Sequence, residues 1–461
     1  MMDYDEFLEG KRFAIADAGK SVSVDDLHPR AFPHQRDITK WALRKGRAAI
    51  FADAGLGKTL MELDWARHAA DRSLIFAPLA VAKQTVREAA KFGIEATYAR
   101  SEESAPKSGI TTANYEMMQH FDPSKWGAVV FDESSCIKSF ASKTRNACIE
   151  FASTIPFRLP ASATPAPNDY IELGNHAELL GVMSQSEMLS MFFVHDGALK
   201  CSSSAWRLKG HAEEEFFKWM GTWAVTMRKP SDFGYDDAGY NLPPCLTHHH
   251  VIETNHDGLS TLFVTEAMNL TDQRKSKRAS IGARVETLAA LVNNSDEPWI
   301  LWCELNDEGD ALEKAIPGSV QISGADSIDK KEQGILDFID GKTRVIISKT
   351  SIFGFGLNLQ HCTNVGFVGV SHSYEQTYQA IRRCWRFGQD KPVNVHMVYA
   401  DTETAIVRNV DRKGKDADRM ATAMIRQMQS GHELVSTRRD KAEYNPRLEM
   451  VMPHFLQGER R

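Results

Sequence analysis

An eight-residue run, Ala52-Asp-Ala-Gly-Leu-Gly-Lys-Thr59, constrains the fold of this chain more than any other part of its sequence. The apolar residues 48–51 precede the run and a helical pattern follows it, so a Gly-x-Gly turn joins a strand to a helix. Glycines in such a turn let backbone N–H groups close around phosphate oxygens, and the helix N-terminus adds its dipole. The sequence therefore predicts a phosphate-binding loop at the edge of a parallel α/β sheet.

The residues of this loop have distinct expected roles. Lys58 would reach the β and γ phosphates of ATP, and the hydroxyl of Thr59 would ligate Mg²⁺. A chance glycine-rich turn is the alternative, and the strand-loop-helix context argues against it. The residues expected to cradle the nucleotide are Ala54, Gly55, Leu56, Gly57, Lys58 and Thr59.

A second apolar run, residues 129–131, ends in Asp132 and Glu133. An acidic pair at a strand end is more often a solvated turn, but the phosphate loop earlier in the chain favours a catalytic pair. We expect Asp132 to bind Mg²⁺, directly or through water. We expect Glu133 to orient and deprotonate the water that attacks the γ phosphate.

Short apolar runs alternate with amphipathic helical patterns near both ends of the chain. Strands separated by helices pair in parallel through right-handed crossovers, and 461 residues are too many for one core. We therefore predict an α/β fold with two doubly wound parallel-sheet lobes. The expected strands are residues 48–51, 74–77, 110–112, 129–131 and 157–159, then 299–303, 319–322, 344–348, 365–368 and 394–398.

A run of arginines lies far from the phosphate loop, within residues 379–389. Arg383 and Arg386 are three positions apart, which on a helix would point both guanidinium groups the same way. Arginine from a second lobe can neutralise the charge that develops on a transferred phosphoryl group. A solvated basic helix face is the alternative. Of the three arginines in this run, we expect Arg382 to matter least.

Charge and cysteine content limit the class of protein. The formal net charge is -6, so any contact with nucleic acid has to come from a local groove. Seven scattered cysteines without a Cys-x-x-Cys pair argue against a disulfide framework or zinc ribbon. The acidic N-terminus does not read as a secretory signal, and no apolar stretch is long enough to span a bilayer. We expect a cytoplasmic protein of a bacterium or a phage-infected cell, with no membrane partner.

Taken together, the motifs resemble those of the Swi/Snf-like ATPases of helicase superfamily two, a family of double-stranded DNA translocases. The matching segments are residues 52–59, Asp132-Glu133, Ser162-Ala-Thr-Pro165, residues 354–360 and residues 379–389. The resemblance covers about residues 28–430, with the motifs in the family's order. It implies two RecA-like lobes with helical insertions, and ATP and Mg²⁺ as cofactors.

Further site residues are implied by this resemblance alone. Gln35 would read adenine, and Gly356 and Asn358 of the fifth motif would also contact the nucleotide. The residues implied to contact the DNA backbone are Pro78, Thr112, Ser348 and Lys349. The chain departs from the family at Ser135 and Trp385, where histidine is usual, and at Arg382, where a small residue is usual.

The expected domains follow from the motifs and from changes in composition. Lobe 1, residues 1–180, carries the ATP-binding motifs, and residues 181–250 form a helical insertion with a linker. A helical insertion of lobe 2 takes residues 251–295, lobe 2 takes residues 296–430, and residues 431–461 are a tail. Basic residues at 274–278 are a further candidate for contact with DNA, and an exposed helix face is equally compatible.

Two other features have a functional and a structural reading. Aromatic residues between positions 192 and 223 would wedge or stack on bases, but their helical spacing is more typical of a small core. His248-His-His250 after Cys245 suggests a metal site, but no second ligand pair accompanies them.

Three functions share these parts. The leading one is an ATP-dependent translocase that tracks along duplex DNA. The second is a strand-separating helicase of replication, recombination or repair, for which the sequence offers no clear hairpin wedge. The third is a nucleotide-gated DNA clamp that recruits a protein partner, which the sequence does not identify.

Overall fold

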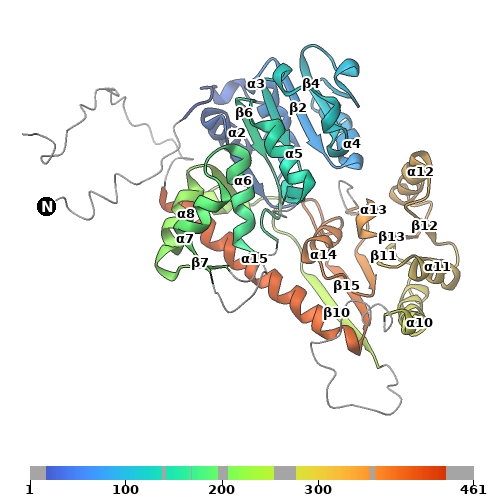
Figure 1. Ribbon diagram of the computed structural model, residues 1–461. Helices are drawn as coiled ribbons and strands as arrows, with labels where there is room; N and C mark the ends of the chain where they lie inside the picture. The colour runs from blue at the N-terminus through green and yellow to red at the C-terminus, as the bar shows by residue number, and fades with distance from the viewer. Residues whose placement is uncertain are drawn as a thin grey trace, which may run out of the picture.

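The computed structural model describes residues 17–137, 142–167, 169–195, 206–253, 277–353 and 359–431. Two parallel sheets, each covered by helices, lie side by side, and a smaller helical unit flanks the first (Figure 1). The prediction of an α/β fold with two doubly wound parallel-sheet lobes is confirmed. Gly356 and Asn358 lie outside the described residues, as do positions 274–276 of the basic cluster.

The sheet of lobe 1 has the strand order β3-β4-β2-β5-β6, and every pair in it is parallel. β1 lies beyond β6, because Ile50 bridges to Ala161 just after that strand, and β1 also pairs with β9. The strands are β1 (Ala49–Ala52), β2 (Arg72–Ala77), β3 (Ala96–Tyr98), β4 (Gly109–Asn114), β5 (Ala128–Phe131), β6 (Phe157–Pro160) and β9 (Ala224–Met227).

Both faces of this sheet are buried. Along β5, Ala128 and Val130 join one apolar cluster, while Val129 and Phe131 join another on the opposite face. This alternation explains why the strand reads as a continuous apolar run. The helices that cover the sheet are α2 (Pro33–Lys45), α3 (Lys58–Ala69), α4 (Leu79–Lys91) and α5 (Lys143–Ala152).

The helical insertion packs a small aromatic core of its own. Phe216, Phe217, Trp219 and Trp223 are buried in it with Phe51 of β1, so these aromatic residues are core and not a DNA wedge. β7 and β8 form an antiparallel pair that the sequence did not predict. The elements are α6 (Leu173–Leu180), α7 (Gln185–Phe192), β7 (Phe193–His195), β8 (Trp206–Leu208) and α8 (Glu213–Gly221).

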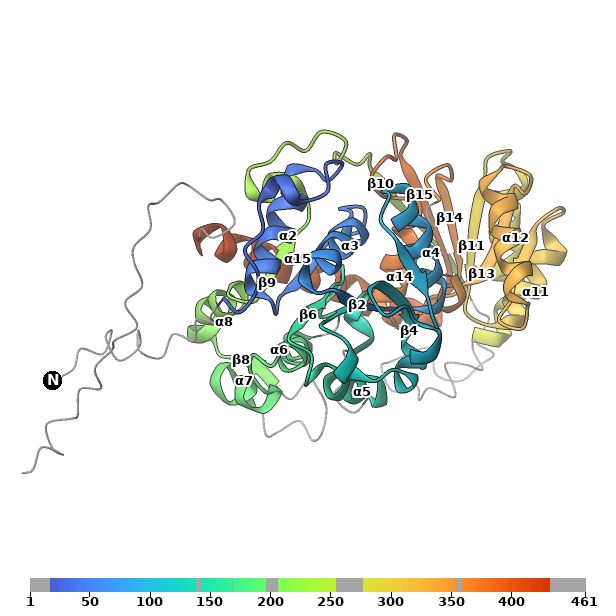
Figure 2. The ribbon, with the colours of Figure 1, turned by 90° about the horizontal axis from the view of Figure 1, so that it is seen from above.

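Lobe 2 has the strand order β10-β15-β14-β11-β13-β12, again with parallel pairs throughout. Its strands are β10 (Cys245–Ile252), β11 (Trp299–Cys303), β12 (Val320–Ile322), β13 (Val345–Lys349), β14 (Asn364–Val368) and β15 (Val393–Ala400). Its helices are α10 (Ile281–Asn293), α11 (Asn306–Ala315), α12 (Ile328–Ile339), α13 (Thr350–Phe353) and α14 (Tyr374–Ile381). Viewed from above, α10, α11 and α12 lie on the side away from lobe 1 (Figure 2).

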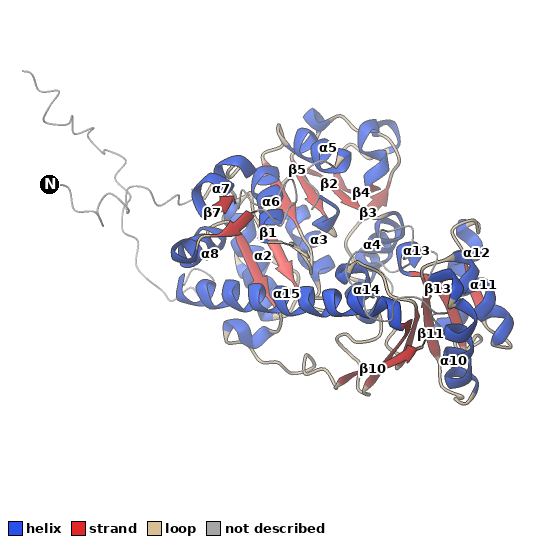
Figure 3. Ribbon diagram, turned by 60° about the horizontal axis from the view of Figure 1, so that its bottom comes forward, coloured by secondary structure: helices blue, strands red, loops and turns tan. Residues whose placement is uncertain are grey.

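The long helix α15 (Thr404–Gly431) connects lobe 2 to the helical insertion, as Figure 3 shows. Its first turns place Ile406 and Val410 in the core of lobe 2, and its last turns place Met420 and Met424 in the core of the insertion. Arg228, just after β9, pairs with Asp418 of this helix at 2.5 Å. α15 therefore ties the two halves of the molecule together.

Short 3-10 segments complete the fold: η1 (Val24–Asp26), η2 (Glu102–Ser104), η3 (Tyr115–His120), η4 (Pro123–Lys125), η5 (Ser134–Ile137), η6 (Tyr170–Glu172), η8 (Gly210–Ala212), η9 (Pro230–Phe233) and η10 (Asp401–Glu403).

The ten predicted strands all occur, with ends that differ by at most two residues. The segment expected as insertion and linker, residues 181–250, is divided differently. Its β9 returns to the sheet of lobe 1, and most of its β10 belongs to the sheet of lobe 2. Among the described residues, no helix combines the length and apolar character that crossing a bilayer requires.

Candidate active site

The phosphate loop joins β1 to α3 in the geometry that its glycines permit. Gly55 and Gly57 have φ values of +92° and +78°, in the left-handed region that favours glycine. Gly57 is also the N-cap of α3, so the first N–H groups of that helix face the loop. Lys58 Nζ donates to Ala52 O at 2.9 Å and to Asp53 O at 3.4 Å. The lysine side chain thus folds back over the loop whose bound phosphates it is expected to contact.

Gln35 lies directly against this loop. Its Nε2 donates to Leu56 O at 2.9 Å, and its Oε1 accepts from Phe32 N at 3.0 Å. A Cβ on Gly57 would come within 2.2 Å of Gln35 Nε2, so this position requires glycine. One amide hydrogen and one oxygen lone pair of Gln35 are left over for a base.

Aromatic rings from three parts of the chain meet beside Gln35. Phe32 contacts Tyr240 and Phe387 with ring centroids 5.8 and 6.2 Å apart, and Tyr240 lies 4.6 Å from Phe387. An apolar wall next to an amide that retains hydrogen-bonding capacity is the pattern of a small-molecule site. This cluster suits a flat nucleobase, and the sequence did not predict it.

Asp132 and Glu133 lie at the carboxyl end of β5. Asp132 is buried, and its Oδ1 accepts the N–H of Glu133 at 2.8 Å. Burial and the neighbouring Glu133 carboxylate together raise the pKa of Asp132 to about 7, against the opposing effect of Lys58. Glu133 has a φ of +50°, a left-handed conformation that costs a non-glycine residue on the order of 1 kcal/mol. Strain of this kind is typical of functional turns.

A third acid, Glu62, lies beside this pair and was not predicted. It is on α3, one turn after Lys58, and its side chain is fully buried. Neither of its carboxylate oxygens has a hydrogen-bond partner. Burial and the neighbouring Asp132 raise the pKa of Glu62 well above its ordinary value. The signal in the sequence was an acid four positions after the loop lysine.

The arginine run meets the phosphate loop across the boundary between the lobes, but not from a helix. α14 ends at Ile381, and the arginines lie in the turns that follow it. The prediction of a helical arginine pair is therefore wrong. The buried Gln389 side chain explains the turn, because its Nε2 donates to Gln360 O at 2.8 Å and to Cys384 O at 3.2 Å, which pins the segment to the body of lobe 2.

Arg382, which we expected to matter least, makes the closest contacts with the loop. Its Nη2 donates to Ala54 O at 2.6 Å and lies 2.9 Å from Asp53 Oδ2. The hydroxyl of Tyr378 on α14 bonds to Asp53 as well. Asp53 therefore ties lobe 2 to the phosphate loop, and hydrogen bonds to an ionised group are the stronger ones.

Arg383 and Arg386 also face lobe 1. Burial lowers the pKa of Arg383 to about 10, while the Glu133 carboxylate opposes this shift. Burial lowers the pKa of Arg386 too, and Glu88 on α4 opposes it. A Cβ on Gly55 would lie 3.7 Å from Arg386 Cβ and 2.9 Å from Phe387 N. The structure thus brings both predicted arginines to the loop and the acidic pair.

A buried histidine lies beside the acidic motif, where the sequence gave no sign of one. His176 on α6 is fully buried, and its Nε2 lies 3.0 Å from Ser134 Oγ. Its ring also packs edge-on against Phe51 of β1, with centroids 5.1 Å apart. Burial lowers its pKa to about 4. His176 thus places an imidazole beside Ser134, one position before Ser135.

Two of the four predicted DNA-contacting residues are inaccessible. Thr112 is fully buried and its hydroxyl donates to Ala82 O at 3.0 Å, while Ser348 is 1% exposed and donates to Ile322 O at 2.8 Å. Both assignments are corrected, because a buried hydroxyl that is already bonded within the fold cannot reach a phosphate. Pro78 and Lys349 lie at strand ends and are partly exposed.

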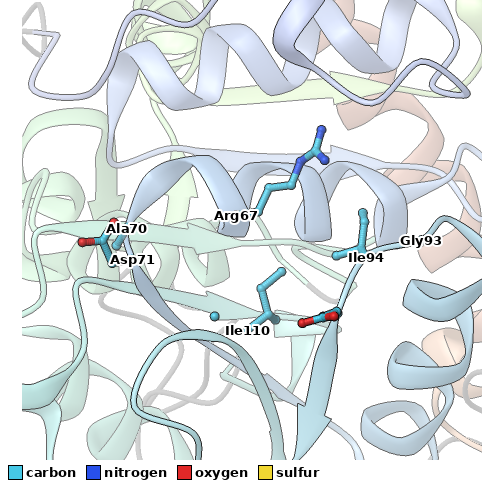
Figure 4. A pocket seen from close by; sticks show the side chains of 8 residues that line it. Arg67, Ala70, Asp71, Gly93, Ile94 and Ile110 are labelled. Atoms are coloured by element: carbon cyan, nitrogen blue, oxygen red, sulfur yellow. The ribbon is translucent and has the colours of Figure 1, made fainter.

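A hollow of about 500 Å³ lies where the acidic motif faces lobe 2. Pro78, Glu133 and Ser135 line it from lobe 1, and Glu375 and Gln376 of α14 line it from lobe 2. A second hollow, of about 260 Å³, is lined by Arg67, Ile94 and Ile110 (Figure 4). No residue of the phosphate loop lines either hollow, but the larger one adjoins the candidate site through Glu133 of the acidic motif.

Some of the buried polar atoms without partners lie at the candidate site, and others are spread over the rest of the described fold. Those at the site include Glu62 Oε1 and Oε2, Glu133 Oε2, Gln379 Nε2 and Arg382 Nε. Buried polar groups normally find partners, and exceptions of this kind point to a missing ligand. Oxygen donors from Thr59 and Asp132 suit a hard cation such as Mg²⁺, and the cationic groups around the loop suit the phosphates of ATP.

No transition-metal site accompanies the histidine run on β10. His248 and His250 stack on His396 of β15, with centroids 4.7 and 5.4 Å apart. In the part of the chain that the structure describes, no three His, Cys, Asp or Glu side chains converge well enough to hold a metal ion by themselves. Lys277 of the basic cluster is buried and paired with Glu304 and Glu403, so it does not face DNA.

Comparison with known proteins identifies the class of the second lobe. Residues 283–388 match the family model of the helicase conserved C-terminal domain. That span begins in α10 and ends just after the arginine segment, which confirms the predicted helicase resemblance for this lobe.

The search of solved structures gave matches, among them one of low sequence identity. The SWI2/SNF2 ATPase core of Sulfolobus solfataricus, in complex with dsDNA, is 18% identical, and the similarity covers 89% of this chain and 99% of that one, with a TM-score of 0.41. The search of curated proteins found no match.

Proposed function

We propose that this protein is an ATP-dependent motor that tracks along duplex DNA. The contact of Arg382 with Ala54 O and Asp53 carries this proposal, because it completes a nucleotide site with groups from both lobes. A site shared across a cleft changes when the cleft opens, which lets hydrolysis drive relative movement of the lobes. The matched helicase C-terminal domain supports the same class of activity.

The residues of lobe 1 would bind and orient the nucleotide. Gln35 and the aromatic cluster would hold the base, the N–H groups of residues 54–59 would hold the phosphates, and Lys58 would turn from its loop carbonyls toward them. Mg²⁺ at Thr59 and Asp132 would supply charge neutralisation. Glu133 would position a water molecule and accept its proton.

The residues of lobe 2 would respond to the nucleotide. Arg382 would exchange Asp53 and Ala54 O for phosphate oxygens, which are stronger acceptors, and Arg383 and Arg386 would neutralise charge as it develops. After hydrolysis the lobes would separate. Partly exposed groups at the strand ends, Pro78 and Lys349 among them, would hold the DNA backbone in alternation.

ATP hydrolysis measured with and without nucleic acid tests this function. We expect duplex DNA to stimulate the rate by tenfold or more. Lys58→Ala and Glu133→Gln should reduce the stimulated rate by at least a hundredfold. Equal rates without nucleic acid and with single-stranded, duplex, forked or junction DNA or RNA would disprove the motor. A partner protein and a cytoplasmic location remain part of the proposal.

Strand separation is a second candidate, because the insertion contains the antiparallel β7–β8 pair that a wedge requires. A displacement assay on forked duplex DNA distinguishes the two. A translocase without a wedge should hydrolyse ATP on this substrate and release no single strand.

A further inference from the structure

Glu62 is a buried acid that the proposed mechanism does not use. Its side chain is fully buried on α3, and both carboxylate oxygens lack a hydrogen-bond donor. An ionised carboxylate removed from water without a partner costs several kcal/mol, so proteins pair such groups or bind a cation with them. A glutamate in this position therefore calls for an explanation from its surroundings.

The neighbours of Glu62 are mostly of its own sign. Asp132 and Glu133 both act on it to raise its pKa, and Lys58 alone among the named neighbours lowers it. The Lys58 ammonium, however, bonds to Ala52 O and Asp53 O in the loop. Asp132 directs its Oδ1 to Glu133 N, which leaves its other oxygen for a shared ligand. The two side chains are also close enough for a hydrogen bond between them, so the pair holds either a shared proton or a cation between its oxygens.

A third acid of the same helix shows the contrast. Asp64 is also buried, but its Oδ1 pairs with Arg67 Nε at 2.7 Å and its Oδ2 accepts from His28 N at 2.8 Å. Asp64 is thus satisfied within the fold, whereas Glu62, two residues earlier, is not. The difference lies in the face of α3, because Glu62 faces the acidic motif of β5 and Asp64 faces away.

We propose that Glu62 is a positioning residue for the divalent cation of the nucleotide complex, acting together with Asp132. Its carboxylate accepts hydrogen bonds from the cation's water ligands, which a hard cation retains in a phosphate site. Because no three such side chains converge to hold an ion alone among the described residues, the cation needs the nucleotide phosphates and Thr59 as well. The inference rests on the proposed nucleotide site and adds a specific acid to it.

Binding of Mn²⁺ to the full chain with ADP tests this role without measuring turnover. Electron paramagnetic resonance of free Mn²⁺ gives the affinity of the ADP complex for the cation. We expect Glu62→Gln to weaken that affinity at least tenfold and Asp132→Asn to weaken it at least as much. Asp64→Asn is the matched control from the same helix, and it should leave the affinity within twofold of the parent.

A second measurement separates a cation role from a structural one. ADP affinity in the presence of EDTA should stay within twofold for Glu62→Gln, because the glutamate acts through the cation, and thermal melting should show that the variant is folded. Unchanged Mn²⁺ affinity in Glu62→Gln, alongside a loss in Asp132→Asn, would overturn the inference. An equal loss of ADP affinity in EDTA would overturn it too, in favour of a packing role. Failure of the parent protein to bind ADP at all would instead remove the proposed function.

Discussion

Each lobe buries a cluster of ionisable side chains, and the two clusters differ in whether these side chains have hydrogen-bond partners. In lobe 2, Arg284 and Glu308 are both fully buried and paired at 2.7 Å. In lobe 1, Glu62 and Asp132 are also buried, but Glu62 has no hydrogen-bond donor outside the acidic motif. Burial alone therefore does not distinguish a structural charge from a functional one.

The cluster of lobe 2 has a partner for each group. Arg284 Nε donates to Ser280 Oγ at 3.0 Å, and its Nη2 donates to Lys277 O at 2.5 Å. The second oxygen of Glu308 accepts from Glu304 N and Leu305 N, each at 2.9 Å. This network joins the start of α10 to the start of α11, so its function is to fix the backbone of the lobe.

The comparison shows that a buried polar cluster is recognised as structural or functional by whether all of its hydrogen-bonding atoms have partners. A saturated network has no capacity left for a ligand, while an unsaturated one is stable only because the fold around it keeps it in place. Substitutions should therefore harm stability in lobe 2 and ligand binding in lobe 1.

The largest expected effect comes from breaking the saturated network. Arg284→Met leaves Glu308 buried without its cation, and loss of one partner of a buried pair costs about 3–5 kcal/mol. Urea denaturation should show this loss of unfolding free energy. Glu62→Gln, which replaces a buried acid that has no partner outside the acidic motif, should change stability by less than about 1 kcal/mol or increase it. The comparison fails if Glu62→Gln destabilises the protein as much as Arg284→Met does.

His176 gives the next effect, as a dependence of stability on pH. Its folded pKa of about 4 lies below the ordinary histidine value of 6.5, so between these values the unfolded chain binds more protons than the folded one. Its contribution is present above pH 6.5 and is lost as the pH falls toward 4, by up to about 1.4 kcal/mol per pH unit. His176→Asn should remove this part of the slope in denaturation series at pH 5, 6 and 7. Identical slopes in the two proteins would show that the imidazole is not kept neutral by its burial.

Most of the fold could be predicted from the sequence because parallel strands buried on both faces read as apolar runs. β10 could not, because its residues include three histidines and it lies at the edge of the sheet. β3 has only three residues, which is too few to show the alternation of apolar and polar side chains that marks a strand. β9 was hidden in a helical stretch, since what makes it a strand is its pairing with β1.

Site residues could be predicted where a short local motif defines them. They could not be predicted where they depend on a contact between segments far apart in the sequence. Lys58 and Asp132 follow from local patterns. The contact of Arg382 with Asp53 depends on a turn that Gln389 fixes from the far side of the segment. Thr112 was misassigned because β4 runs on to Asn114, which leaves the threonine inside the sheet.

The contact between the lobes offers a third, smaller effect. Tyr378→Phe removes the hydroxyl that bonds to the Asp53 carboxylate, which is worth about 1.5 kcal/mol or roughly tenfold in the ratio of closed to open forms. Energy transfer between one label on each lobe should show more of the open form in the nucleotide-free protein. Tyr374→Phe is the control, because Tyr374 packs 5.7 Å from Tyr378 on the same helix and has no bond to Asp53 in the structure. Equal opening in both variants would mean that aromatic packing, and not the hydroxyl, holds the lobes.

The smallest effect is expected at a hydroxyl of lobe 1 that already makes its hydrogen bond within the fold. Thr112→Val removes one buried hydrogen bond to Ala82 O, so unfolding free energy should fall by about 1 kcal/mol. The DNA concentration that gives half-maximal ATPase stimulation should stay within twofold of the parent. Lys349→Ala, at a partly exposed strand end, should raise that concentration several-fold, because it removes a cation from the DNA phosphates. If Thr112→Val weakens DNA stimulation as much as Lys349→Ala does, β4 has to open when DNA binds, and a completed hydrogen bond would no longer identify a purely structural group.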